Sequence, residues 1–465
     1  GRTRIRISDF MHEVDRRLWE LGVPAKSEHN EAAPAQHELA SVFDIANVDC
    51  DRNQLVMEVL RVVAKEKGLA CLLHEKPFRG TNGSGKHHNY SLVTDDGINL
   101  LSPGKKPEQN LQFQLILCAF IKGVDEYADL LRLSSATASN DHRLGGFEAP
   151  PAIISIFLGD YLSSILYKTA HGENMVHGDR SYMRIGAPVL PGVLKDDSDR
   201  NRTSPFAFTG NKFEFRMPGS SLSLSGPNTV LNTAVAEALS QFSDILEKVP
   251  SEGLPDAVHT LLRDSFRTHE RIIFNGNGYT EEWLEEAKQR ELPNLKSTPD
   301  ALPHMISDKN ICLMTKHSVL TKEEIFARYE IALENYVKTL HIESKTLIEM
   351  VQKDFLPSSI SYAGELAFTG AKKRQLSDSI STRTEEMLAA KLSLLNDRIS
   401  GGLEQLKEDT AAAERLEGYL EAARYYQETI LPEIEALRLL LNEAEELIPD
   451  DCLPYPTYSR LLFSV

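Results

Sequence analysis

The spacing of apolar residues along the chain changes character near residue 300. Before that point, apolar residues recur every three or four positions between Asn53 and Lys67, and this spacing predicts an amphipathic helix. Short β-branched and aromatic stretches predict strands in the same part, namely CLLHE (71–75), NYSLVT (89–94) and FAFTGNKFEFRM (206–217). We therefore expect residues 1–300 to fold as an α+β domain.

After residue 300 the pattern is helical almost throughout. Thr321 and Glu324 form the sequence signature of a capping box, which predicts a helix that begins there and runs to about Lys353, before Pro357. We expect residues 301–465 to form a separate helical C-terminal region.

A stretch rich in Glu, Leu and Ala follows from Ser377 to Ile448, interrupted by Gly401-Gly402 and by Pro432. Because glycine pairs and prolines interrupt helices, the breaks predict a helical hairpin or bundle rather than one long coiled coil. Its Glu-rich faces are typical of a solvated packing or assembly element.

The composition narrows the possible partners and compartment. The chain has 465 residues, 41% hydrophobic content and a formal net charge of −17, which argues against nucleic-acid partners and anionic membranes. No apolar run approaches the roughly 18 residues of a membrane span. Five widely separated cysteines suggest a reducing compartment, so we expect a cytoplasmic location, or a plastid one if a transit peptide precedes Gly1.

The stretch GTNGSGKHHNYSL (80–92) resembles a phosphate-binding P-loop at first sight. A P-loop, however, needs Ser or Thr after its lysine and a helix that begins there, whereas His87 follows Lys86 and the next residues predict a strand. The interpretation as a P-loop therefore fails. What remains is a glycine turn that places His87 at the start of a strand, although a single histidine is more often a structural residue than a ligand.

Three further clusters carry candidate chemistry. Glu31 and Glu38 flank a turn that contains Pro34, and two such carboxylates could bind one hard cation, or could equally belong to an acidic surface loop. Strict alternation puts three charged residues on one face of a strand, where they could form a polar site or an exposed face; they are Lys212, Glu214 and Arg216. Arg200 and Arg202 share a loop and suit carboxylate or phosphate.

Taken together, these segments resemble glutamine synthetases, and specifically the long type III branch, over essentially the whole chain. The resemblance rests on HNEAAPAQHE (29–38), NGSGKHHNYSL (82–92), NDHRLGGFEAPPAIISIFLG (140–159), DRNRTSPFAFTGNKFEFRM (199–217) and PYPTYSRLLF (454–463). It implies antiparallel strands that form an active-site funnel, at a subunit boundary of stacked hexameric rings (a dodecamer). It also implies ATP-dependent amidation of L-glutamate by ammonium through γ-glutamyl phosphate, in nitrogen assimilation.

The same resemblance assigns metal ligands for Mg²⁺ or Mn²⁺, with two or more ions in each site. Glu31 and Glu38 match ligands of the ion nearest to glutamate. His87 and Glu214 match ligands of the ion that bridges the ATP phosphates.

Substrate and catalytic residues follow from the resemblance in the same way. For glutamate they are Asn82, Gly83 and Arg143, and for the nucleotide they are Ser91 and Lys212. The catalytic residues are Glu148, which would shield the intermediate and take a proton from ammonium, Arg202, which would stabilise charge during phosphoryl transfer, and Arg216, which would face substrate and phosphate.

Two departures from the family pattern qualify these expectations. The family also uses a Glu-x-Glu pair on an early strand after a small N-terminal domain, and the chain as given shows neither, so we expect it to lack an N-terminal part and to be incomplete for activity. After Arg202, the segment TSPFAF replaces a pattern that supplies another arginine in shorter branches. Two alternatives stay open: a catalytically silent scaffold of this family, and a γ-glutamyl ligase for a larger amine.

Overall fold

The structure is a computed structural model that describes the chain except residues 1–4, 173–181, 184–192, 195–202, 458–459 and 462–465. Within the described residues the chain forms two compact units, Gly1–Phe326 and Ala327–Val465. The functional boundary expected at residue 300 stays a prediction. No helix among the described residues is long and apolar enough to cross a membrane.

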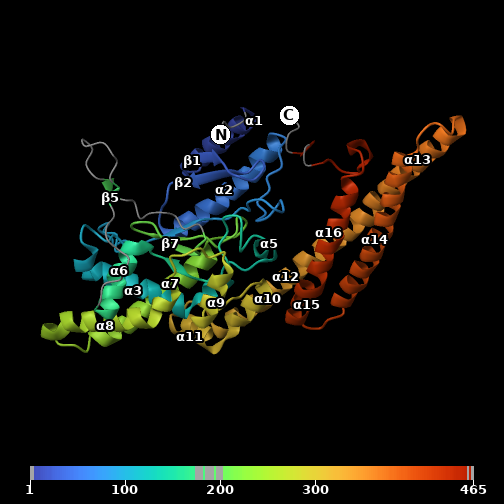
Figure 1. The fold of residues 1–465 in the computed structure, drawn as a ribbon. Helices are drawn as coiled ribbons and strands as arrows, with labels where there is room; N and C mark the ends of the chain where they lie inside the picture. Colours follow the sequence, from blue (N-terminus) through green and yellow to red (C-terminus); the bar gives the residue numbers. More distant parts are fainter. Residues whose placement is uncertain (1–4, 173–181, 184–192, 195–202, 458–459, 462–465) are drawn as a thin grey trace. The chain divides into compact units, whose positions relative to one another are not determined.

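The first unit contains a four-stranded sheet in the order β3-β8-β7-β4, of which Figure 1 labels β7. β8 (Phe213–Phe215) pairs antiparallel with both β3 (His88–Tyr90) and β7 (Phe206–Phe208), and β7 pairs parallel with β4 (Ile156–Phe157). The strands predicted from FAFTGNKFEFRM are thereby confirmed, whereas the strand predicted from NYSLVT ends at Tyr90. The strand predicted at CLLHE is wrong, because the backbone there bonds to the glycine turn instead, with Ser84 N donating to Glu75 O at 2.7 Å.

Aromatic side chains on one face of this sheet form the core of the unit. The ring of Phe213 stacks on Phe120 with centroids 3.7 Å apart, and Phe206 stacks on Phe215 at 4.3 Å. Phe120 lies on the almost wholly buried helix α3 (Leu111–Glu126), which packs against α7 (Ser225–Leu246) and α8 (Leu254–His269). The alternation of β8 thus directs both phenylalanines into the core and leaves the residue between them on the opposite face.

The first unit contains further helices and a small ribbon between residues 128 and 316. The helices are α4 (Ala128–Leu133), α5 (Ala138–Asp141), α6 (Gly159–His171), α9 (Glu281–Gln289), α10 (Thr298–Ala301) and α11 (Asp308–Lys316). A two-stranded ribbon is formed by β5 (Tyr182–Met183) and β6 (Val193–Leu194). Short 3₁₀ turns occupy Pro107–Gln109, Ser251–Gly253, Glu270–Ile272 and Leu302–Ile306.

The N-terminal part of the first unit is an antiparallel hairpin beside two helices. The hairpin consists of β1 (Ala25–Asn30) and β2 (His37–Ser41), and the helices are α1 (Ile5–Glu20) and α2 (Ala46–Glu66). The two helices bury a shared apolar cluster that includes Val14, Leu18, Val56 and Val63. The helix predicted over residues 53–67 is confirmed, and it begins one turn or more earlier than its apolar spacing indicated.

Helices account for almost all of the second unit. They are α12 (Lys322–Met350), which begins in the first unit, α13 (Leu356–Leu376), α14 (Arg383–Ala413), α15 (Tyr419–Tyr425) and α16 (Leu431–Glu445), with a 3₁₀ turn at Asp450–Cys452. α14 packs against both α13 and α16, which confirms the predicted hairpin or bundle. The capping box is also confirmed, since Glu324 N donates to Thr321 Oγ1 at 3.2 Å and Thr321 N donates to Glu324 Oε2 at 2.8 Å.

The predicted breaks in these helices are wrong in position. Pro357 and Pro432 each follow a π-helical turn, Val351–Phe355 and Tyr426–Ile430, and the helical path continues through both. The wider turn accommodates the proline ring where the hydrogen-bond register changes. Gly401-Gly402 lies inside α14, and that helix ends only at Ala413, because apolar residues at helical spacing on either side of the glycines are buried.

Candidate active site

The first group of candidate residues lies on the polar face of the β3–β8 pair. His87 directly precedes β3, Arg216 directly follows β8, and Glu214 is the central residue of β8. His87 Nδ1 lies 2.9 Å from Glu214 Oε1, while Arg216 donates from Nη2 to Glu214 Oε2 at 2.8 Å and from Nε at 3.1 Å. The alternation read from the sequence therefore does place Glu214 and Arg216 together, and the glycine turn brings His87 to them.

Burial and charge make Glu214 a strong anionic centre. Burial by itself raises the pKa of the Glu214 carboxyl, but the neighbouring His87 and Arg216 outweigh burial and lower this pKa to about 2. The Glu214 side chain is only 7% exposed, whereas that of His87 is 48% exposed. A carboxylate with one buried cationic neighbour and one accessible imidazole is suited to binding a cation from the solvent side.

The opposite end of the same strand pair carries the two residues predicted to bind the nucleotide. Tyr90 and Phe213 form the last pair of the β3–β8 ladder, and Ser91 and Lys212 are the next residues beyond it. Ser91 is exposed and Lys212 is half-buried. Glu214 thus lies between the His87–Arg216 end of the pair and the Ser91–Lys212 end, while nucleotide binding itself stays a prediction.

The second group of candidate residues lies on the β1–β2 hairpin. Glu31 and Glu38 approach a common neighbour, since His29 Nε2 lies 2.7 Å from Glu31 Oε1 and 3.6 Å from Glu38 Oε2. One ligand atom from each of the three side chains lies within 4.8 Å of the other two. The turn between the strands therefore brings the two carboxylates together, as the spacing allowed, and adds a histidine that the sequence analysis did not select.

Gln36 ties this hairpin to the glycine turn that carries His87. Its backbone carbonyl accepts from Glu31 N at 2.9 Å and its side-chain carbonyl accepts from Ala33 N at 3.1 Å, so it closes the hairpin turn. Its amide nitrogen donates to Gly83 O and to Ser84 Oγ, both at 3.0 Å. The two groups of candidate metal ligands consequently belong to one connected structure through this side chain, which the sequence analysis missed although it lies inside the HNEAAPAQHE motif.

The lysine of the glycine turn faces away from both groups. Lys86 Nζ donates to Asn53 Oδ1 at 2.6 Å and to the carbonyl of Leu222, and it lies 3.1 Å from Met57 Sδ. Burial lowers the pKa of Lys86 to about 8. Lys86 therefore joins helix α2 to the glycine turn. Because its ammonium group is used in these contacts, Lys86 does not act as the phosphate-binding lysine of a P-loop.

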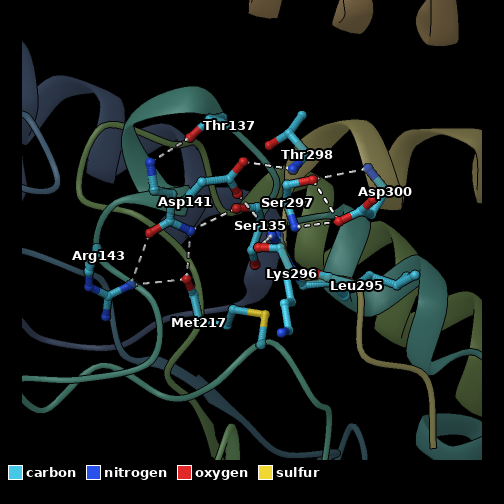
Figure 2. A network of polar contacts seen from close by, with 12 residues as sticks. Ser135, Thr137, Asp141, Arg143, Met217, Leu295, Lys296, Ser297, Thr298 and Asp300 are labelled. Carbon is cyan, nitrogen blue, oxygen red and sulfur yellow. Dashed lines mark hydrogen bonds and ion pairs between the residues drawn. The ribbon is translucent and has the colours of Figure 1, made fainter. Parts of the chain in front are cut away.

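Arg143 is buried behind the glycine turn. Its Nη1 donates to Met217 O at 3.1 Å and its Nη2 donates to Arg216 O at 2.9 Å, and its side chain is one of those drawn in Figure 2. The short helix before it is fixed by Asp141, which accepts from Arg132 Nη2 at 2.9 Å and from Thr298 N at 2.6 Å. Arg143 thus holds the backbone on both sides of Met217, and contact with a substrate carboxylate stays a prediction.

The glycines of the turn are needed for this packing. A Cβ atom on Gly83 would lie 2.5 Å from the carbonyl oxygen of Glu75 and 2.9 Å from Arg143 Cγ, and one on Gly85 would lie 2.0 Å from Arg143 Nη2. Asn82 is half-buried in the same turn. Close packing against the Glu75 backbone and the Arg143 side chain therefore explains these glycines without any ligand.

Replacing Gly83 by alanine is expected to destabilise the protein by about 1–3 kcal/mol, the usual range for overpacking, because the Glu75 carbonyl that would be displaced is already hydrogen-bonded to Ser84 N. Urea unfolding measures this effect. Gly146→Ala is the matched control, since a Cβ there meets no atom within 4 Å, and its free energy of unfolding should stay close to wild type. Equal stability of the two variants would contradict the packing argument.

Glu148 lies in a tight loop with an unusual backbone. Phe147 and Glu148 have φ angles of 51° and 67°, in the left-handed region that non-glycine residues rarely adopt. The loop is closed by Gly145 N donating to Pro150 O and Ala149 N donating to Gly146 O, both at 3.0 Å. No helix begins at Pro150, because the next helix starts at Gly159, so Glu148 does not lie at a helix N-terminus.

Tyr279 is a further residue near this loop that the sequence analysis missed. Its hydroxyl donates to Ala149 O at 2.9 Å. Burial raises the pKa of Tyr279, the charge of Glu148 raises it further, and the charges of Arg143 and Arg216 oppose the rise. Glu148, Arg143 and Arg216 therefore all lie within electrostatic reach of one hydroxyl group. Arg202, the other predicted catalytic arginine, lies outside the described residues.

Glu75 is another residue that the sequence analysis missed. Its side chain is completely buried, and its Oε1 accepts from Ser221 N at 2.8 Å and from Ser221 Oγ at 2.6 Å. Its charge raises the pKa of both Lys86 and Arg143, in opposition to the effect of burial. Glu75 is thus a buried counter-charge for the two cations beneath the glycine turn.

Comparison with protein families gives two matches along the chain. Residues 3–154 match the family described as "Glutamine synthetase, catalytic domain", and residues 257–374 match "Glutamine synthetase C-terminal domain". Among solved structures, the chain is similar to a "GmaS/ADP complex" at 17% identity, over 72% of this chain and 61% of that one, with a TM-score of 0.42.

Individual relatives match over the whole chain. They are a glutamine synthetase of Butyrivibrio fibrisolvens, at 47% identity over 100% of this chain and 66% of the relative, and a type-3 glutamine synthetase of Dictyostelium discoideum, at 39% identity over 100% of this chain and 64% of the relative. A glutamine synthetase of Bacteroides fragilis is 37% identical over 99% of this chain and 64% of the relative. The chain thus spans slightly less than two thirds of the length of these relatives.

Proposed function

The chain belongs to the glutamine synthetase family, and from that membership we propose that the full-length protein joins ammonia to the γ-carboxylate of L-glutamate at the expense of ATP, in nitrogen assimilation. In the first step a γ-carboxylate oxygen attacks the γ-phosphorus of ATP, and the bond to ADP breaks. In the second step ammonia attacks the carbonyl carbon of γ-glutamyl phosphate, and phosphate leaves with that oxygen. The contact of His87 and Arg216 with Glu214 is the observation that supports this proposal best.

The donor set suits divalent ions. Glu31 and Glu38 converge on one point of the β1–β2 hairpin, and Glu214 and His87 converge on the β3–β8 pair. Carboxylate oxygens suit Mg²⁺ and Mn²⁺, and imidazole is acceptable to Mn²⁺. We assign the first pair to an ion near glutamate and the second pair to an ion on the ATP phosphates, where bound ions neutralise the charge that develops during phosphoryl transfer.

The chain's own charged groups supply the rest of the proposed chemistry. Arg216, which donates to Glu214, would also donate to the transferred phosphoryl group, as would Arg202. Arg143, with Asn82 and Gly83, would position glutamate. Glu148 would close over the intermediate, exclude water from it and accept a proton from ammonium.

Metal removal tests the proposal directly. Full-length protein with glutamate, ammonium and ATP is expected to form glutamine with Mg²⁺ or Mn²⁺. It should lose about 90% or more of this activity in excess EDTA and recover it when the ion is added back, because the Glu31–Glu38 pair and the Glu214–His87 pair would both bind cations in the proposed mechanism. Undiminished turnover in EDTA would contradict the metal assignment. Hydroxylamine or methylamine in place of ammonium shows whether a larger amine is the better substrate.

We also propose that the helical unit contacts other copies of the chain in a ring oligomer. Large apolar side chains are exposed on its helices, including Phe368 on α13 at 64% and Leu394 on α14 at 62%. Amphipathic helices without chemistry of their own usually bury their apolar side chains against a partner or against the parent domain, and a second copy of the chain is the partner proposed here.

The double substitution Phe368→Asp and Leu394→Asp is therefore expected to lower the mass of the full-length protein in solution, as measured by light scattering. Ser361→Asp adds a charge at an exposed position of the same helix α13 and serves as the control. An unchanged mass for the double variant would argue against the assembly role.

A further inference from the structure

The β1–β2 hairpin offers a histidine at the place where two carboxylates already converge. His29 and Glu38 are direct cross-strand partners, and Glu31 lies two residues beyond His29 on the same side of the chain. The neighbouring cross-strand pair uses the opposite face, where His37 Nδ1 lies 3.1 Å from Asn30 Oδ1. The register of the hairpin therefore places His29, and not His37, with the two carboxylates.

The distances among the three side chains suit one ion. Ligand atoms about 2.1 Å from an octahedral cation lie about 3 Å apart when adjacent and about 4 Å apart when opposite. His29 Nε2 lies 2.7 Å from Glu31 Oε1 and 3.6 Å from Glu38 Oε2, and the whole set lies within 4.8 Å. The three side chains are 30–50% exposed, which leaves room for water or substrate as further ligands.

We propose that His29 is a direct ligand of the ion bound by Glu31 and Glu38, and that it makes this site favour Mn²⁺ over Mg²⁺. The proposal rests on the proposed function, which supplies the ion for the two carboxylates. An all-oxygen set suits Mg²⁺ at least as well as Mn²⁺, whereas an imidazole nitrogen favours the transition metal. His29 is therefore a residue that determines metal specificity, in addition to holding Glu31 in place.

The experiment uses full-length protein and Mn²⁺ alone as the probe. His87 is the other candidate histidine ligand, so all samples carry His87→Gln. Electron spin-echo spectroscopy then reports whether a histidine nitrogen is bound to the remaining Mn²⁺. The expected result is clear nitrogen modulation in His87→Gln, its loss when His29→Gln is added, and its retention when the exposed His12 on α1 is changed to Gln instead.

The same variants give the metal preference. His29→Gln is expected to weaken Mn²⁺ binding by about tenfold or more while changing Mg²⁺ binding much less, because glutamine replaces nitrogen with an oxygen donor. Three results would overturn the inference: bound Mn²⁺ that shows no nitrogen modulation, nitrogen modulation that survives His29→Gln, or a preference for Mn²⁺ over Mg²⁺ that His29→Gln leaves unchanged. Each of them would leave the metal assignment of Glu31 and Glu38 standing. Mn²⁺ binding that is unaffected by Glu31→Gln and Glu38→Gln together would overturn both.

Discussion

Glu214→Ala in the full-length protein is expected to reduce glutamine formation by about a hundredfold or more and to destabilise the fold by about 3–5 kcal/mol. The loss of activity follows from removing a proposed metal ligand and the group that orients Arg216 in an electrostatically organised site. The loss of stability follows because Arg216 is 2% exposed and would lose the carboxylate of Glu214, which it contacts at 2.8 Å. Steady-state assays and urea unfolding measure the two effects.

Two comparisons make this prediction specific. Glu58→Ala removes an exposed carboxylate on α2 whose nearest arginine nitrogen is 3.9 Å away, and it should change stability by no more than about 0.5 kcal/mol.

The pKa of Glu214 is lowered from its ordinary 4.5 to about 2, so the ionised Glu214 carboxylate stabilises the fold fully above pH 4.5, and this stabilisation is lost as the pH falls towards 2. Wild type should therefore lose more stability than Glu214→Ala over that interval, and equal losses would contradict the assignment.

Glu148→Ala is expected to separate ATP cleavage from glutamine formation. If Glu148 accepts the ammonium proton and excludes water from γ-glutamyl phosphate, glutamine formation should fall by about 10²–10⁴-fold, the usual contribution of a general base. ATP cleavage should continue at a higher rate than glutamine formation, with glutamate and phosphate as products. The measurement is the ratio of glutamine to ADP at saturating ammonium.

The backbone of the loop provides the control for this prediction. Glu148 has a φ of 67°, and alanine at that position must adopt the same left-handed backbone conformation. A change in the ratio of glutamine to ADP is therefore due to loss of the carboxylate and not to a change of the backbone. Glu148→Gln keeps the size and polarity of the side chain but accepts no proton at neutral pH, and it should uncouple the reaction like Glu148→Ala. A wild-type ratio in both variants would reject the catalytic role.

Local sequence patterns predicted the parts of the site that depend on a single element. The alternation of Lys212, Glu214 and Arg216 was sufficient to put Glu214 and Arg216 on the polar face of β8, because a strand has a fixed side-chain period. The capping box at Thr321 was predicted for the same reason, since all of its partners lie within one turn.

Contacts between distant segments could not be predicted from such patterns. The Gln36 side chain donates to Gly83 O, and the Lys86 side chain donates to Leu222 O. Both hydrogen bonds join segments that only the packed fold brings together. Glu75 gives no periodic signal, although it is buried beneath the turn as a counter-charge. The prolines at 357 and 432 misled the prediction of helix ends, because π-helical turns and tertiary packing allow a helical path to continue through them.

The central claim is that the full-length protein makes glutamine through γ-glutamyl phosphate, and the fate of the γ-carboxylate oxygen tests it most directly. Glutamate labelled with ¹⁸O in that carboxylate is incubated with the protein, ATP, ammonium and Mg²⁺, and the released phosphate is analysed by mass spectrometry. The account predicts that one phosphate is released for each glutamine formed and that this phosphate carries one labelled oxygen, because the attacking carboxylate oxygen leaves with the phosphate. Glutamine formed together with unlabelled phosphate would contradict the account.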